Sequence, residues 1–175
     1  MNKAEKKARE VLEQHRVTKA PTPLDNIVKS YGIRVVEKPY DATGYHDVSG
    51  MLYRSTTETV VGLNEKHSDT RRRFSLAHEL GHFLLHKGEL FVDAKVNFRN
   101  RLSSMGTDRE EIEANAFAAE LLMPSDLVSS EFYKLFDDKK SSQHDAPVEF
   151  LASRFKVSTE AMEFRLRNLG LLQIE

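Results

Sequence analysis

The sequence predicts an α+β fold in which a small, twisted sheet forms early in the chain and helices form late. Three short segments rich in β-branched residues lie before residue 65, whereas helical spacing of apolar residues dominates from about Ser68 onward. The chain has 175 residues, of which 39% are hydrophobic and 30% charged, a balance typical of a globular protein that buries its own core. We therefore expect a single domain over residues 1–175.

Residues 1–66 are expected to form two helices and the sheet. A narrow apolar stripe predicts a helix over Asn2–His15, and Pro23 begins a second helix that Gly32 ends in the left-handed region. β-Branched composition then predicts three strands, at Ile33–Glu37, Val48–Arg54 and Thr59–Leu63.

Residues 67–137 are expected to form the helical core, and residues 146–172 a C-terminal helical pair similar to a helix-turn-helix. Apolar periodicity predicts helices over Ser68–Leu85, Asp108–Leu122, Asp126–Phe136, Val148–Phe155 and Thr159–Leu169. The stretch Lys87–Gly106 is expected to be rich in loops.

Composition narrows the chemistry and the location. The absence of cysteine excludes disulfides, cysteine nucleophiles and thiolate metal sites, so a bound metal would have His, Asp or Glu ligands. The formal net charge of -1 gives no global attraction to nucleic acid or to anionic membranes. The lysine-rich segment Met1–Arg9 has no apolar stretch after it, and no apolar run reaches membrane-spanning length. We expect a cytoplasmic protein with no membrane partner.

The segment Phe74–His86 contains the residues that indicate a catalytic site. Its His78-Glu79-x-x-His82 pattern lies in a predicted helix, where positions four apart share a face, so both imidazoles can bind one cation. Glu79 lies one residue further round the helix, within reach of water at the same site, which suits a general base. Apolar neighbours bury this helix, and buried imidazoles and carboxylates are costly unless they are paired or bound to metal.

Other residues of the same helix are expected to support the site. His86 continues the four-residue spacing but stands about 12 Å along the helix axis from His78, too far to share an ion with it, so we expect a supporting or structural role. A third histidine six residues after His82 would extend the motif, but Gly88 occupies that position. Gly81, inside the helix, predicts close packing of a neighbouring element.

A catalytic zinc ion usually has three protein ligands and one water, so a second element must supply the third ligand. The helix predicted over Asp108–Leu122 offers several carboxylates. Glu110 suits a capping role and Glu111 points to another face, whereas Glu113 lies where the helix becomes apolar. We therefore expect Glu113 to be the third metal ligand, and Glu120 to orient a histidine or to pair with an arginine. Such ligands suit Zn²⁺ best, with Mn²⁺ or iron as alternatives.

Two segments together carry a family resemblance. Arg73–His82 and Glu113–Pro124 closely resemble the ImmA/IrrE family of metallopeptidases, with weaker matches at Gly50–Tyr53 and Leu151–Ser158. The resemblance implies a zincin-like fold, in which the sheet packs against the two-histidine helix, and a glutamate ligand that corresponds to Glu113. Family members cleave helix-turn-helix transcriptional repressors, so the implied partner is a folded XRE-like repressor and the implied function is relief of repression.

The site residues predict metal-assisted hydrolysis of a peptide bond, in which Glu79 takes a proton from water and returns it to the leaving amine. An extended substrate is expected to pair with an exposed sheet edge near Tyr53 or Val60–Asn64. Tyr53 is also a candidate for stabilising the oxyanion, and a half-buried strand aromatic is an equally acceptable interpretation of it.

Two alternatives to a peptidase stay open. One is DNA binding by the C-terminal helical pair, through Arg154, Lys156, Arg165 and Arg167. Because Glu160 and Glu163 occupy the would-be recognition helix, we favour a packing or substrate-docking role for this pair. The other is a catalytically inactive protein that binds a repressor without cutting it, and a small toxin-like reading frame beside the gene would indicate a toxin-antitoxin pair.

Overall fold

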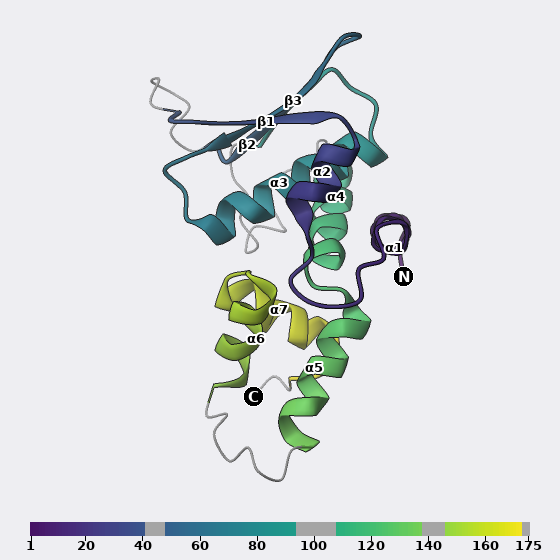
Figure 1. Cartoon of the computed structure of the whole chain (residues 1–175), viewed down its shortest axis with the longest axis vertical. Helices are drawn as coiled ribbons and strands as arrows, with labels where there is room; N and C mark the ends of the chain where they lie inside the picture. Colours follow the sequence, from purple (N-terminus) through teal and green to yellow (C-terminus); the bar gives the residue numbers. More distant parts are fainter. Residues whose placement is uncertain (41–47, 94–107, 138–145, 173–175) are drawn as a thin grey trace.

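The computed structural model describes residues 1–40, 48–93, 108–137 and 146–172, and it confirms the α+β prediction. The sheet lies at one end of the molecule and the last three helices at the other, with the longest helix, α3, against the sheet (Figure 1). None of the helices in the described ranges has both the length and the apolar character that crossing a membrane requires.

Four strands form the sheet in the order β1-β3-β2-β4. Their bounds are Ile33–Lys38 for β1, Gly50–Arg54 for β2, Thr59–Asn64 for β3 and Leu90–Asp93 for β4. β1 pairs with β3 in parallel, whereas β2 runs antiparallel to both β3 and β4. Among the described strands, β1 and β4 are therefore the outermost.

The face of the sheet that is formed by Gly50, Leu52, Val61 and Leu63 is buried, because α3 (Asp69–Leu85) packs on it. Ser68 caps this helix by accepting a hydrogen bond from the Arg71 amide. The placement is a consequence of strand alternation, since side chains at every second position point to the same face.

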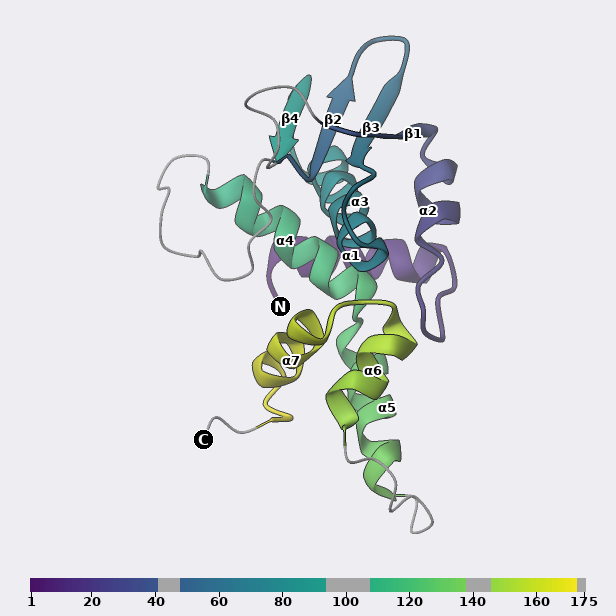
Figure 2. The ribbon, with the colours of Figure 1, turned by 90° about the vertical axis from the view of Figure 1, so that its left-hand side faces the viewer.

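Three helices surround α3 on its other sides. α1 (Lys3–Gln14) and α4 (Asp108–Leu122) pack against each other on the side of α3 that is away from the sheet, and α2 (Leu24–Ser30) lies beside β1 (Figure 2). A capping box at Asn2 fixes the start of α1, whose small and branched apolar residues Ala4, Ala8, Val11 and Leu12 are buried. Because α4 packs against both α3 and α1, it has two different buried faces.

The C-terminal helices are α5 (Ser125–Asp137), α6 (Pro147–Phe155) and α7 (Thr159–Asn168), which share the hydrophobic core with the rest of the chain, and one buried carboxylate also links α5 and α7 to it. Glu120, at the end of α4, accepts hydrogen bonds from Arg9 of α1, Ser125 of α5 and Arg165 of α7. The prediction that Glu120 pairs with an arginine is therefore confirmed. Arg165 is itself buried and also donates to the Met123 carbonyl.

Most predicted elements are present with ends shifted by one or two residues, including the left-handed Gly32 after α2. The stretch expected to be loop-rich, Lys87–Gly106, contains β4, and the sequence analysis missed this strand. Its four residues are too few for a reliable alternation signal, so only its pairing with β2 identifies it.

Candidate metal centre

The centre is formed by two histidines of α3 and one glutamate of α4. His78 and His82 lie one turn apart, and their Nε2 atoms are 3.0 Å from each other. The two oxygens of Glu111 complete the group, each 3.2 Å from one Nε2 atom. The donor atoms of the three residues all lie within 4.8 Å of one another. Both histidines are buried, whereas the side chain of Glu111 is 39% exposed, so the group opens to solvent on the α4 side.

The structure brings Glu111 to the histidines in place of the predicted Glu113. Two residues correspond to about 200° around a helix, so the two carboxylates leave α4 on opposite sides. Glu113 instead lies 3.3 Å from His86 Nε2 and accepts a hydrogen bond from Arg109 Nε at 3.0 Å. α4 also packs against α1 and so has a second buried face, which means that apolar surroundings alone do not tell which of its carboxylates meets the histidines.

The third donor has a signal in the sequence, which lies in the spacing of Glu111 and Asn115. These residues are four apart and so share a face of α4, and Asn115 Oδ1 is 3.1 Å from His78 Nδ1. Ala114, on the same side, lies directly against Gly81 of α3, which confirms that this glycine allows close packing. The face of α4 that meets the histidine helix could therefore have been identified from Glu111, Ala114 and Asn115 together.

Both metal-facing histidines also have partners on their second ring nitrogen. His78 Nδ1 pairs with Asn115, and His82 Nδ1 is 3.0 Å from His86 Nδ1. Phe91 of β4 stacks on the His82 ring, with 4.5 Å between ring centroids. These contacts fix the orientation of the two rings so that the Nε2 atoms converge.

The electrostatics of the centre suit a cation. Partial burial tends to raise the pKa of Glu111, but hydrogen bonds from His78 and His82 outweigh it and hold the pKa well below its ordinary value. Burial lowers the pKa of His82, although Glu111 opposes this shift. An ionised carboxylate and a neutral imidazole are the protonation states that metal ligands need.

Glu79 is fully buried, and its carboxylate lies against the first residue of β2. A Cβ added at Gly50 would stand 2.8 Å from Glu79 Oε1, so the glycine provides the space that this carboxylate occupies. Glu79 directly follows His78 on α3, and burying an ionised carboxylate so completely is costly.

Two of the proposed substrate features lie elsewhere. Tyr53 is on the sheet face opposite α3 and is 44% exposed, so it is not aimed at the centre. Residues Val60–Asn64 belong to β3, which is flanked by β1 and β2 and offers no free edge. Of the described strands, the outermost one beside the centre is β4, through Phe91.

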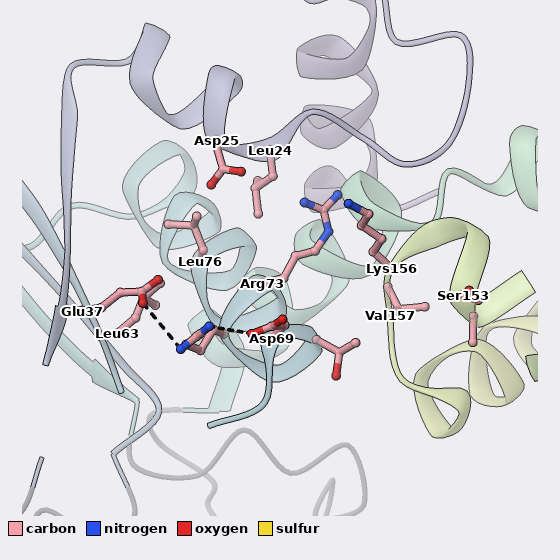
Figure 3. Close-up of a pocket in the computed structure, with 13 residues that line it drawn as sticks. Leu24, Asp25, Glu37, Leu63, Asp69, Arg73, Leu76, Ser153, Lys156 and Val157 are labelled. Atoms are coloured by element: carbon pink, nitrogen blue, oxygen red, sulfur yellow. Dashed lines mark hydrogen bonds and ion pairs between the residues drawn. The ribbon is translucent and has the colours of Figure 1, made fainter. Parts of the chain in front are cut away.

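A cleft of about 500 Å³ lies apart from the histidines, between α2, the N-terminal half of α3 and the turn that joins α6 to α7 (Figure 3). Its charged lining residues are three cations and three anions: Arg72, Arg73, Lys156, Asp25, Glu37 and Asp69. Arg72 pairs with both Glu37 and Asp69. Because the charges balance and no metal-ligating group of the centre lines it, the cleft is a separate feature.

Comparison with known proteins identifies the family of the chain. A family model described as peptidase family M78, the IrrE N-terminal-like domain, matches residues 28–167. The chain belongs to this family. As an IrrE N-terminal-like domain it has the zincin-like α+β fold that the sequence resemblance implied. The chain is also 28% identical, over 117 residues, to Uncharacterized immunity region protein 2 of Bacillus phage phi105, which covers 61% of this chain and 69% of the phage protein.

The donor set of this IrrE N-terminal-like domain fits a divalent metal. Two imidazole nitrogens and one carboxylate are the protein ligands of many catalytic zinc sites, in which a fourth position stays open. The partly exposed Glu111 and the supported rings of His78 and His82 match that pattern. Membership of a peptidase family together with this group supports a metallopeptidase-like domain.

Proposed function

We propose that the protein is a zinc-dependent endopeptidase, with His78, His82 and Glu111 as metal ligands and Glu79 as the general base. The observation that carries the proposal is the convergence of two supported imidazoles and an ionised carboxylate beside a fully buried Glu79. A bound Zn²⁺ would supply Lewis-acid polarisation of a carbonyl group and lower the pKa of water at the site.

Side chains of the protein carry out the proton transfers and hold the proposed ligands in place. Glu79, held by the wall at Gly50, accepts a proton from the attacking water and transfers it to the amine of the leaving fragment. His78 and His82 keep their orientation through Asn115 and His86, so little reorganisation is needed during the reaction. No side chain forms a covalent bond to the substrate in this scheme.

The outer edge of β4 is the proposed docking line for an extended substrate segment. β4 is outermost among the described strands, and its Phe91 contacts the ring of a metal ligand. Backbone hydrogen bonds to such an edge hold a peptide in register irrespective of its side chains. A peptide paired with β4 would pass the open side of the centre, which replaces the edge near Val60–Asn64 proposed from the sequence.

A helix-turn-helix repressor is the proposed substrate, and the cytoplasm is the proposed location. Support comes from the family resemblance and from the phage relative, whose name places it in an immunity region. DNA binding by the C-terminal helices is disfavoured because three of the four cations considered for it are already engaged: Arg165 is buried against Glu120, Arg154 pairs with Glu131, and Arg167 pairs with Glu163. The pair is proposed to pack against the core.

The test is incubation of the zinc-loaded protein with the repressor encoded beside its gene, followed by mass spectrometry of the products. We expect a defined cut with the wild type and at least a 100-fold slower reaction with Glu79→Gln, at unchanged zinc content. Glu110→Gln is the matched control, because Glu110 is an exposed glutamate on α4, and it should cleave normally. Equal cleavage by Glu79→Gln would remove this residue from its role, and repressor binding without any cleavage would favour the inactive alternative.

A further inference from the structure

The hydrogen bonds behind the metal centre form a chain that crosses from α3 to α4. His82 Nδ1 is 3.0 Å from His86 Nδ1, and His86 Nε2 is 3.3 Å from Glu113 Oε2. The second oxygen of Glu113 accepts a hydrogen bond from Arg109 Nε at 3.0 Å. Each link therefore joins a side chain to the next, from the buried ligand to the surface.

The direction of each hydrogen bond follows from the need to bind a cation. A histidine that uses Nε2 as a ligand has no proton on that atom, so a neutral His82 carries its proton on Nδ1. His82 Nδ1 then donates, and His86 Nδ1 must accept. A neutral His86 whose Nδ1 accepts has its own proton on Nε2, where only an acceptor can receive it. Glu113 is a carboxylate and can only accept when ionised, so it completes the chain in the required direction.

We infer that His86 and Glu113 are positioning residues, which fix the proton of His82 on Nδ1 and thereby leave its Nε2 lone pair for the metal. The inference rests on the proposed metal centre and extends it. It also accounts for a glutamate that the sequence singled out but that the structure places away from the ligands. The opposite polarity, with a donor facing His86 Nε2, would direct a proton from His86 onto His82 Nδ1 and place the His82 proton on Nε2, where it blocks the metal.

Burial protects the inner hydrogen bonds of this chain of side chains from competition by water. The side chains of His82 and His86 are 1% and 4% exposed, and that of Glu113 is 19% exposed, so water competes poorly for the two inner links. Arg109 is 89% exposed and is expected to contribute little, as surface ion pairs generally do. For His78 the corresponding acceptor is the amide oxygen of Asn115, so both ligands have a second partner, but only that of His82 extends through another histidine.

The first test reads the proton positions directly, by long-range ¹H–¹⁵N NMR of histidine-labelled, zinc-loaded protein. We expect the spectra to show a proton on Nδ1 of His82 and on Nε2 of His86. A spectrum in which His86 carries its proton on Nδ1 would refute the proposed direction of the hydrogen-bond chain without any variant being made. This readout does not depend on peptidase activity or on knowing the substrate.

The second test measures zinc affinity by competition with a chromogenic chelator. Glu113→Ala removes the acceptor and should weaken zinc binding by about 10- to 100-fold, whereas Glu113→Gln keeps an acceptor oxygen and should recover most of that loss. Glu110→Ala, on the exposed side of α4, controls for removal of one negative charge from the helix and should leave the affinity unchanged. Thermal denaturation of each metal-free variant checks that it folds.

Glu111→Gln separates the two hypotheses, because it removes a proposed ligand and should reduce zinc affinity more than Glu113→Ala does. If Glu111→Gln binds zinc like the wild type, the proposed metal centre itself is wrong. If Glu111→Gln loses zinc while the zinc affinity of Glu113→Ala stays within twofold of that of the wild type, the proposed metal centre is supported and the positioning role of His86 and Glu113 is refuted.

Discussion

Gly81 is the position at which a single methyl group is expected to test how closely the two helices of the candidate metal centre must pack. It lies on α3 between the proposed ligands His78 and His82 and faces α4. A Cβ built at Gly81 would stand 3.1 Å from the Cα atom and 3.2 Å from the carbonyl oxygen of Ala114, and 3.2 Å from the ring of Phe117. Gly81→Ala therefore introduces an atom where two of the three contacts are backbone atoms that cannot rotate away.

The magnitude follows from two opposing terms. Ordinary contact begins at 3.4 Å, so α4 must move away by about 0.3 Å. Overpacking of this kind costs about 1–3 kcal/mol, whereas replacing glycine by alanine inside a helix gains about 1 kcal/mol. We expect a net loss of about 0–2 kcal/mol in the free energy of unfolding of the metal-free protein.

The displacement should matter more for metal binding than for stability. Glu111 and Asn115 lie within one turn of Ala114, so they move with the helix segment that Gly81→Ala pushes away. Ligand distances must stay within about 0.2 Å of their preferred values, and we expect zinc affinity to fall by about tenfold. Gly81→Ser should show a larger loss, because its side chain is longer in the same direction.

Urea denaturation of the metal-free protein and chelator competition with zinc measure the two quantities separately. If Gly81→Ala is more stable than the wild type by about 1 kcal/mol and binds zinc equally well, helix propensity alone decides. The close approach of α3 to α4 would then have no role in the centre, and the steric reasoning would be refuted.

Three further perturbations follow from particular contacts. Gly50→Ala places a Cβ 2.8 Å from Glu79 Oε1 and should slow repressor cleavage by about 100-fold while zinc affinity, measured by chelator competition, stays the same. Glu120→Ala leaves a buried arginine without its counter-charge and should cost about 3–5 kcal/mol in urea denaturation, whereas Glu163→Ala, at an exposed ion pair, should cost less than about 1 kcal/mol. Burial lowers the pKa of His67, so the unfolded chain takes up a proton at a higher pH than the folded protein does, and stability falls as the pH decreases from 7 to 5. His67→Gln should flatten that dependence in denaturation curves measured across this range, and an unchanged slope would contradict the assignment.

Local chemistry explains why much of the fold could be predicted. Helix starts and ends are set by residues within one turn, so the left-handed Gly32 after α2 was predicted, and the predicted start of α3 at about Ser68 agrees with the residue that caps it. The two-histidine motif is equally local, because its spacing of four decides which face its members share. By contrast, the parallel pairing of β1 with β3 and the edge position of β4 depend on contacts between distant segments, which no short pattern contains.

The third donor shows why the apolar periodicity of a helix with two buried faces does not predict which face meets which neighbour. α4 packs on α3 through the face of Glu111, Ala114 and Asn115, and it also packs on α1, whereas Glu113 leaves the helix on the opposite side from Glu111. An apolar surround therefore marks both carboxylates as inward-facing without telling which helix each one meets. A second contact is needed to fix the rotation of α4 about its axis. Gly81 provides it, because this residue of α3 has no side chain and lies against the small Ala114 of α4. The geometry that brings Glu111 to the histidines thus also brings Glu113 to His86, so one rotation of α4 sets both the proposed ligand and the group proposed to orient its neighbour.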